Sequence, residues 1–447
     1  MTILDDARRV IENGPVCDSC LGRCFADRSF GLTNDERGNA LRVAAALEDD
    51  EPYEDEDAEC WVCEGESARF DLWAETVADA LEGWEFDTYQ VGTRTPPLIE
   101  ENEVLLRESA GLPEDAGELF KSEFNREVGK RVGRLTGAEV DFGRPDVLAL
   151  LNVEAAPEPG SDEGISSHAV DVQINSAFVY GRYRKLERDI PQTEWPCREC
   201  GGSGKQLAED GGEEPCDYCG GSGYMYEESV EQLTTPPVLS AMDGGEALFH
   251  GAGREDVDAL MLGTGRPFVI EVKRPRVRNV DATALQDEIN EFADGKVEVT
   301  DLALATHAMV ERVKELDASK TYRMDVEFDD DVTESALDEA IAELDGATVE
   351  QDTPQRVDHR RASLTRTRQA YDVSGHLEDP RHAELETHGE GGLYIKELVS
   401  GDEGRTDPSL AGLLGVGAVV TALDVVAVEG EDEPFDAPEF LKASVEA

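Results

Sequence analysis

The spacing of apolar positions predicts a chain built from amphipathic helices and short, half-buried strands. Apolar residues three and four positions apart predict helices at residues 3–13, 35–47, 66–82, 115–135, 282–293, 304–316 and 333–344. Alternating or short apolar runs predict strands at residues 86–91, 170–174, 267–272, 321–328, 392–398 and 418–428. Stretches 155–166 and 204–214 are predicted to be flexible loops. Helices and strands mixed without a regular β-α-β rhythm favour the α+β class.

Length and charge narrow this picture. The 447 residues suggest two or three domains. Asp and Glu total 100 against 41 Lys and Arg, so the formal net charge is −59. These acids are dispersed along periodic segments, which argues against an acidic tail or plain disorder. They indicate a halophilic protein of a salt-saturated cytoplasm, where a Debye length of about 3 Å screens self-repulsion.

Targeting signals are not evident in the chain. No run of about 18 apolar residues occurs, and the most apolar stretch, Leu413–Leu423, is short and closed by Asp424. The opening residues, MTILDDARRV, are acidic and lack the apolar segment of a signal peptide. We therefore expect a cytoplasmic protein without a membrane-spanning helix. Nine cysteines in a reducing compartment indicate metal binding or catalysis before disulfides.

Eight of the nine cysteines form four CxxC pairs, at Cys17/Cys20, Cys60/Cys63, Cys197/Cys200 and Cys216/Cys219. Fifteen residues separate the third and fourth pairs, and GGSG follows each, which predicts a four-cysteine zinc ribbon. The first and second pairs, 39 residues apart, are predicted to share a structural zinc ion, with Cys24 outside it. Reduced, unliganded thiols are the alternative. A redox pair is disfavoured because neither set ends a βα unit.

The repeated CxxCGGSG also resembles part of the zinc region of DnaJ-type chaperones. That region carries four such knuckles, and those proteins have an HPD tripeptide. This chain has two knuckles of this kind and no HPD, so we set that interpretation aside.

Basic residues gather in three clusters within the acidic chain. The first contains Arg182, Arg184, Lys185 and Arg188, and the second contains Arg266, Lys273, Arg274, Arg276 and Arg278. The third contains Arg356, His359, Arg360, Arg361, Arg366 and Arg368. Phosphate is the natural partner of such clusters, and three together predict a nucleic-acid partner. The alternative for each cluster is ion pairing with nearby acids.

Three short motifs follow one another in the second half of the chain. Gly253–Asp256 reads GRED, Lys320–Tyr322 reads KTY and Gly392–Lys396 reads GLYIK. They resemble the aspartate motif, the tyrosine strand and the third motif of pseudouridine synthases. Longer segments resemble the archaeal and eukaryotic family that modifies the TΨC arm of tRNA, namely GRYRKLERDIPQTEWPCREC, GREDVDALMLGTGRPFVIEVKRP, RVDHRRASLTRTR and YIKELVSGDEGRTDPSL.

This resemblance implies a multidomain α+β protein. It implies a zinc-bearing region at 1–66, a THUMP-like α/β domain at 67–190, and a synthase domain at 191–447 with a CxxC/CxxC insertion at 195–224. The implied activity is an isomerisation that converts uridines 54 and 55 of tRNA to pseudouridine. The chemistry needs no small-molecule cofactor, and zinc is structural. The implied partner is tRNA, no membrane is involved, and we expect a monomer.

Two features depart from the family pattern. Leu260 stands where the family usually places an arginine, two residues after the DVD tripeptide, which predicts that one phosphate contact is made elsewhere. A long acidic insertion separates the first two CxxC knuckles, and we expect it to weaken or rearrange that metal site.

The resemblance assigns the central role to Asp256. Pseudouridine formation breaks the N1–C1′ bond, turns the uracil and rejoins it through C5. Asp256 is the nucleophile at C1′ or the base that generates a glycal, and the sequence leaves both open. A carboxylate in a pocket that excludes water needs an opposite charge nearby to remain ionised, and Lys396 is the expected partner. Ile395 is expected to pack beneath the site.

Three more residues are expected to contact the substrate. Tyr322 would stack on the target base and assist removal of the C5 proton, and Tyr394 is a second contact. Arg254 and the basic clusters would hold the phosphates flanking an extruded uridine. The alternatives are that both tyrosines are ordinary strand residues and that Lys396 is a surface cation.

Two other classes of protein compete with the synthase interpretation. A THUMP-bearing methyltransferase or thiolation enzyme needs a Gly-rich loop after a strand, but Gly263–Pro267 precedes one. A non-catalytic, zinc-containing tRNA-binding protein is the other alternative. The presence of Asp256, Tyr322 and Lys396 together argues against it.

Overall fold

The computed structural model divides the chain into two compact units, Met1–Asn175 and Ser176–Ala447. The residues it describes are 2–53, 60–161, 164–208, 211–354 and 364–442. The division lies earlier than the limit expected after residue 190, because β5 (Ala177–Lys185) pairs with β9 and β10 of the second unit. No helix in the described ranges is long and apolar enough to cross a membrane. The helices and sheets confirm the predicted α+β class.

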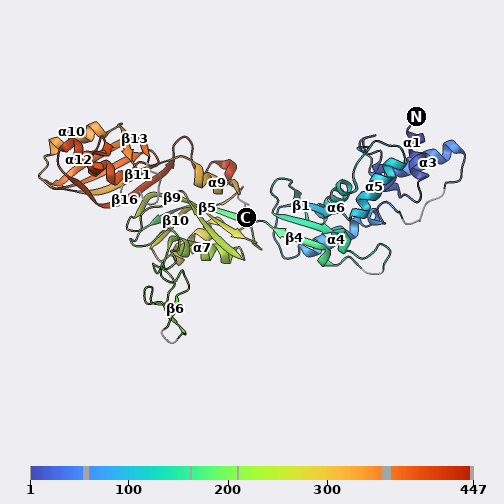
Figure 1. Cartoon of the computed structure of the whole chain (residues 1–447), viewed down its shortest axis with the longest axis horizontal. Coiled ribbons are helices and arrows are strands. Elements are labelled where there is room, and N and C mark those ends of the chain that lie inside the picture. Colours follow the sequence, from blue (N-terminus) through green and yellow to red (C-terminus); the bar gives the residue numbers. More distant parts are fainter. Residues whose placement is uncertain (1, 54–59, 162–163, 209–210, 355–363, 443–447) are drawn as a thin grey trace. The chain divides into compact units, whose positions relative to one another are not determined.

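The first unit combines a four-stranded sheet with helices (Figure 1). The sheet order is β2-β1-β3-β4, with strands β1 (Thr88–Arg94), β2 (Glu139–Val140), β3 (Val147–Asn152) and β4 (Val170–Ile174). The helices are α1 (Ile3–Ile11), α2 (Asp18–Arg23), α3 (Asn34–Asp49), α4 (Phe70–Ala80), α5 (Pro97–Ser109) and α6 (Phe120–Thr136). The structure confirms the predicted helices at α1, α3 and α4; α6 begins later than predicted, and α2 and α5 were not predicted.

Aromatic packing between α4 and α6 forms the centre of the first unit's core. Trp73, Phe120 and Phe124 are fully buried. The rings of Trp73 and Phe124 meet edge to face with centroids 5.9 Å apart, a geometry that adds about 1 kcal/mol to the burial itself. Buried and half-buried residues alternate along β1, because successive residues of a strand point to opposite faces of the sheet.

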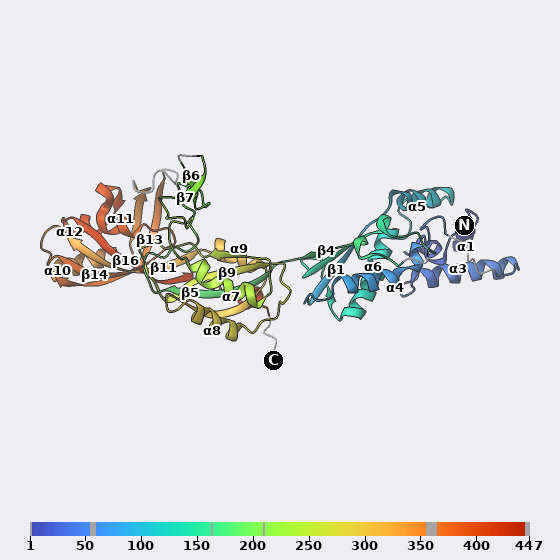
Figure 2. The same ribbon diagram turned by 90° about the horizontal axis from the view of Figure 1, so that it is seen from below.

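The second unit contains one long mixed sheet (Figures 1 and 2). Its order is β10-β5-β9-β16-β11-β14-β13-β12-β15, and β8 pairs with β9. The strands are β8 (Glu246–Gly251), β9 (Met261–Lys273), β10 (Val297–Ala305), β11 (Ala318–Phe328), β12 (Thr348–Asp352), β13 (Thr365–Asp379), β14 (His382–Gly389), β15 (Thr406–Asp407) and β16 (Ala418–Gly430). Its helices are α7 (Val230–Ala241), α8 (Ala282–Phe292), α9 (Ala308–Glu315), α10 (Glu334–Leu344), α11 (Ile395–Ser400) and α12 (Leu410–Leu414).

Two hydrophobic cores share this sheet. One contains residues of β5, β9 and β10 with α7, α8 and α9. The other contains residues of β11, β13 and β14 with α10, α11 and α12. The half-buried Tyr322 packs against both. The halves join where β9 and β16 run parallel, with Val425 opposite Met261 and Ala427 opposite Gly265. Tyr322 therefore marks the seam between the two cores.

Two local predictions were wrong. The predicted strand 392–398 contains helix α11, because Gly392 turns the chain with φ +91° and the apolar residues Ile395, Leu398 and Val399 then follow at helical spacing. The predicted loop 204–214 contains most of a hairpin, in which β6 (Lys205–Leu207) pairs with β7 (Glu213–Pro215).

Candidate active site and metal centres

A cavity of about 300 Å³ opens at the seam of the second unit. Its walls combine cations, carboxylates and two tyrosines with an apolar side. The lining residues are Arg254, Glu255, Asp256, Ala259, Arg266, Lys320, Tyr322, Leu393, Tyr394, Ile395, Lys396, Leu423 and Val425. All six residues expected to act on the substrate thus meet in one pocket, although 140 positions of sequence separate Asp256 from Lys396.

The two charges expected to pair do so. Lys396 Nζ lies 3.2 Å from Asp256 Oδ2. The Asp256 side chain is 55% exposed and that of Lys396 is 33% exposed. The expectation of a carboxylate enclosed away from water is therefore wrong for the free protein. The pair contributes little to folding stability, because solvent screens two charges that are this exposed.

The loop carrying Asp256 connects β8 with β9. Gly253 turns the chain with φ +70°, and the Ala252 N–H donates to the carbonyl of Pro267. At the other end, the Leu260 N–H donates to Asp424 Oδ1 of β16 at 2.9 Å. Both ends of the loop are thus fixed to neighbouring strands, which leaves the Asp256 carboxylate at the mouth of the pocket.

The two tyrosines approach the pocket from different elements. Tyr322 projects from β11, and burial raises the pKa of its hydroxyl; the nearby Arg266 lowers it and Asp256 raises it further. Tyr394 immediately precedes α11, and its buried hydroxyl has no hydrogen-bond partner among the described residues. Ile395 is 4% exposed and belongs to the second core. A substrate base that enters the pocket can therefore pack against the ring of Tyr322 and hydrogen-bond to the hydroxyl of Tyr394.

Arg254 is exposed at the rim, with its guanidinium carbon 5.7 Å from the centre of the Trp195 ring. Trp195 begins the CxxC hairpin, since the Met225 N–H donates to its carbonyl oxygen. This cation–π contact holds the Arg254 guanidinium at the rim, where it can reach the part of a ligand that stays outside the pocket.

Glu255 and Lys320 line the pocket but were not predicted as site residues, and Arg266 was predicted only as a phosphate ligand. Glu255 is buried and accepts from Arg266 Nε at 2.8 Å. The signal in the sequence was weak. Arg266 is a charge at the start of the apolar run Pro267–Val272, and only a buried partner explains a charge there.

The first basic cluster does not form a phosphate-binding surface. Arg182 donates to the carbonyls of Thr264 and Val428, Arg184 pairs with Glu298, Arg188 pairs with Asp424, and Lys185 is fully buried. The alternative of local ion pairing holds for these residues. The prediction of a phosphate contact is therefore wrong here.

In the other two basic clusters, several members pair with nearby acids or contact a ring. In the second, Arg266 is buried on Glu255, Lys273 pairs with Glu246 at 2.8 Å, and Arg276 lies 3.7 Å from Asp243. In the third, Arg366 lies over the Tyr394 ring and Arg368 pairs with Glu390. Residues 355–363, which include Arg356, His359, Arg360 and Arg361, lie outside the described residues.

The cysteines form the two groups that their spacing predicts. Within each group, the four Sγ atoms all lie within 4.8 Å of one another. The first group is Cys17, Cys20, Cys60 and Cys63, and the second is Cys197, Cys200, Cys216 and Cys219. The acidic insertion does not keep the first two knuckles apart, so the expected rearrangement of this group is not seen. Cys24 stays outside both groups, with its sulfur 3.5 Å from the carbonyl of Cys20.

The sulfur spacing fits a tetrahedral ion. A Zn–S bond of about 2.3 Å requires sulfurs about 3.8 Å apart. The measured separations are 3.8 Å for Cys17–Cys63, 3.5 Å for Cys20–Cys60 and 3.9 Å for Cys200–Cys219. Hydrogen bonds with Cys17 and Cys20 lower the pKa of Cys63 to about 6, whereas burial raises that of Cys20. The donor set and spacing of each group thus suit a tetrahedral metal ion, and both groups can hold one.

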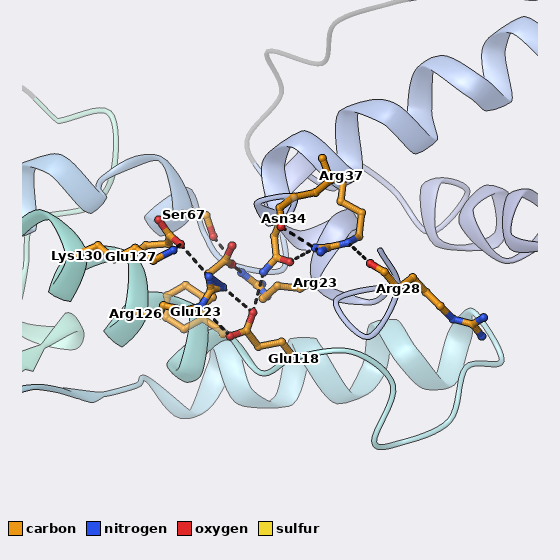
Figure 3. Close-up of polar contacts among 12 residues, drawn as sticks. Arg23, Arg28, Asn34, Arg37, Ser67, Glu118, Glu123, Arg126, Glu127 and Lys130 are labelled. Atoms are coloured by element: carbon orange, nitrogen blue, oxygen red, sulfur yellow. Dashed lines mark hydrogen bonds and ion pairs between the residues drawn. The ribbon is translucent and has the colours of Figure 1, made fainter. Parts of the chain in front are cut away.

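A buried arginine adjoins the first cysteine group. Arg23 is 2% exposed and donates to Cys20 Sγ at 3.0 Å. It also donates to Ser67 at 3.1 Å and to Glu123 of α6 at 2.7 Å (Figure 3). A guanidinium beside thiolates offsets negative charge, so Arg23 ties the cysteine group electrostatically to α6.

Comparisons with known proteins cover both units of the chain. The family model for the Pus10 C-terminal region matches residues 178–429, and the model for the archaeal Pus10 THUMP domain matches residues 73–152. A tRNA pseudouridine synthase Pus10 from Halorubrum lacusprofundi is 66% identical over 99% of this chain and all of its own length. The chain belongs to the Pus10 family. This confirms the resemblance drawn from the motifs.

More distant relatives carry the same name. The Pus10 protein of Methanothrix thermoacetophila is 42% identical over 96% of this chain and 95% of its own. That of Pyrococcus furiosus is 38% identical over 95% and 98%. The Pus10 THUMP match falls inside the first unit, and the C-terminal match covers the whole pocket of the second.

Proposed function

We propose that this chain is a tRNA pseudouridine synthase that isomerises uridines 54 and 55 of the TΨC arm. The observation that carries the proposal is the Asp256–Lys396 pair beside Tyr322, in a pocket of a Pus10 family member. The reaction interconverts uridine isomers, so it requires neither an oxidant nor an activated donor.

Asp256 acts on the ribose of the target nucleotide. Its exposed carboxylate attacks C1′ as the N1–C1′ bond breaks, or removes a ribose proton to give a glycal. Either route requires the carboxylate in its ionised form. Lys396 at 3.2 Å stabilises that form, and more strongly once the bound nucleotide displaces water from the pocket.

The freed uracil must turn within the pocket before C5 meets C1′. Tyr322 provides a ring face on which the base stacks, and its hydroxyl is placed to help remove the C5 proton. The apolar wall of Leu393, Leu423 and Val425 lets the base rotate without directional hydrogen bonds. Arg254 at the rim contacts a flanking phosphate once the nucleotide is extruded.

The two cysteine groups hold structural zinc ions. When bound, zinc supplies folding stability and no step of the reaction. Cys17, Cys20, Cys60 and Cys63 would tie the N-terminal helices to the first unit's core, in which Cys20, Cys60 and Cys63 are buried. Cys197, Cys200, Cys216 and Cys219 would close the base of the hairpin beside Trp195.

The position of the target uridines is tested with matched transcripts. An unmodified tRNA, its U54C and U55C forms, and the double change would each carry tritium at C5 of uridine. We expect tritium release from the first three and none from the double change. Release from the double change above background would contradict the assignment, and loss in one single change would restrict it to one uridine.

Replacing Lys396 with Met is expected to slow the reaction about 10²-fold without weakening tRNA binding. The charge that stabilises the ionised carboxylate is lost, but the exposed pair adds little to the fold. Single-turnover rates and filter binding measure the two effects. Lys296→Met is the control, because Lys296 pairs with Glu228 outside the pocket lining. Equal rates for the two variants would refute the role of Lys396.

Replacing Tyr322 with Phe separates stacking from proton removal. The ring remains, so tRNA affinity should stay within about twofold, whereas the rate should fall by about 10²-fold if the hydroxyl assists at C5. Tyr322→Ala should in addition lose stacking of about 1–3 kcal/mol. Titration by fluorescence anisotropy and the tritium assay give both numbers. A Phe variant as fast as the parent would limit Tyr322 to stacking.

A further inference from the structure

A fully buried group of charges lies beneath the Asp256 loop. The side chains of Lys185, Glu255 and Arg266 are 0–1% exposed, and Tyr183 is 0% exposed. Burying an ammonium, a guanidinium and a carboxylate is costly unless each is satisfied. Charges are seldom buried to this extent for packing alone, and this group adjoins the pocket.

Each member of the group holds part of the loop. Arg266 donates to the carbonyl of Ala252 at 2.8 Å and to the Glu255 carboxylate at 2.8 Å. Gln192 donates to the carbonyl of Gly253 at 2.8 Å and to Tyr183 Oη, and Tyr183 in turn donates to Glu255. The residues before Asp256 are thus anchored through backbone carbonyls and through the Glu255 side chain.

Lys185 anchors the loop at Asp256 itself. Its ammonium donates to the carbonyl oxygens of Asp256 at 3.3 Å, Val257 at 3.0 Å and Ile190 at 2.8 Å. These three acceptors match the three N–H donors of an ammonium. Glu255 lies 3.9 Å away and supplies the opposite charge. Burial lowers the pKa of Lys185 and Glu255 counters this.

We infer that Lys185 is a positioning residue for the reaction, which fixes the Asp256 backbone so that the exposed carboxylate meets C1′ at a set distance. The inference rests on the proposed function. Lys396 holds Asp256 through its side chain, and Lys185 holds it from the interior through its main chain. A displacement of about 1 Å at a reacting group costs about 10²-fold in rate, so a rigid backbone at this position matters.

A matched pair of substitutions tests this role. Arg182 lies three residues before Lys185 on β5 and also donates to backbone carbonyls, those of Thr264, Gly265 and Val428. None of these three belongs to the pocket lining. Lys185→Met and Arg182→Met therefore both remove a cation that holds carbonyls, but only the first releases the Asp256 loop.

The measurement is the single-turnover rate with saturating enzyme and C5-tritiated tRNA, together with the tRNA dissociation constant. We expect Lys185→Met to lower the rate about 10²-fold with the dissociation constant within twofold, and Arg182→Met to keep the parental rate. Circular dichroism gives the folded fraction by which each rate is divided. If Lys185→Met does not fold, Lys185→Gln, which keeps an N–H donor, should give an intermediate loss.

These measurements distinguish a failure of the positioning role of Lys185 from a failure of the proposed synthase activity. Equal rate losses in the two Met variants, or a loss in Lys185→Met that lies wholly in tRNA affinity, would overturn the positioning role. A parental rate in Lys185→Gln, when Lys185→Met cannot be measured, would overturn it as well. An inactive parent protein refutes the proposed function instead.

Discussion

Asp256→Asn is expected to lower the rate of pseudouridine formation by about 10⁴-fold or more. The amide is almost the same size as the carboxylate, but it neither attacks C1′ nor accepts a ribose proton. Since the Asp256 side chain is 55% exposed and its ion pair lies at the pocket mouth, the fold should persist. The variant should therefore bind tRNA with near-parental affinity while failing to turn it over.

Asp258→Asn is the matched control for this experiment. Asp258 stands two residues further along the same loop, is exposed and is not part of the pocket lining. Its loss removes the same charge from the protein without touching the site. If both variants retain activity within tenfold of the parent, Asp256 is not the catalytic carboxylate.

Cys60→Ser is expected to unfold much of the first unit. Bound structural zinc contributes folding free energy on the order of 10 kcal/mol in small domains, which is comparable to the stability of a whole domain. Cys60 is 3% exposed and its neighbours Val62 and Cys63 are also buried in the same core. Loss of one ligand should therefore release the zinc ion and its contribution to folding, and leave three cysteines clustered around an empty site.

Thermal unfolding in molar KCl, together with metal content from mass spectrometry, measures this effect. Cys24→Ser is the control, because Cys24 is 4% exposed in the same core but lies outside the cysteine group. We expect one equivalent of zinc to disappear with the unfolding transition of the first unit only in Cys60→Ser. Parental zinc content and parental melting in that variant would contradict the metal assignment.

Residue spacing predicted much of this structure because the relevant information is local. Helices such as α1, α3, α8 and α10 repeat their apolar residues at helical spacing over several turns. A CxxC knuckle places two metal ligands on one turn, so a four-cysteine site forms wherever two knuckles come together. The Asp256–Lys396 contact came instead from the resemblance, since nothing in the spacing links residues 140 apart.

The errors arise where long-range contacts decide the outcome. Arg188 reads as a phosphate ligand next to Arg184 and Lys185, yet its partner Asp424 lies 236 residues away. In a chain with more than two acids for each cation, distant carboxylates reach most basic clusters. Likewise, the burial of Glu255 depends on β5 and β9 lying side by side, which the register between Tyr183 and Arg266 sets and the local pattern does not.

The strand predicted at 392–398 failed for a different reason. Its alternation of Leu393 and Ile395 fits a strand over only a few residues, whereas β14 ends at Gly389 and Gly392, with φ +91°, turns the chain before α11. The consequence for the site is direct. Lys396 lies in the first turn of α11, and this helix, rather than a sheet edge, brings its ammonium to Asp256.

In the proposed function, the pocket around Asp256 isomerises uridine in tRNA. The most direct test incubates the protein in molar KCl with an unmodified tRNA transcript and maps pseudouridine by carbodiimide modification and primer extension, beside Asp256→Asn. We expect reverse-transcription stops from uridines 54 and 55 with the parent protein and none with the variant. A parent protein that binds the tRNA but produces no stop at any uridine would contradict it.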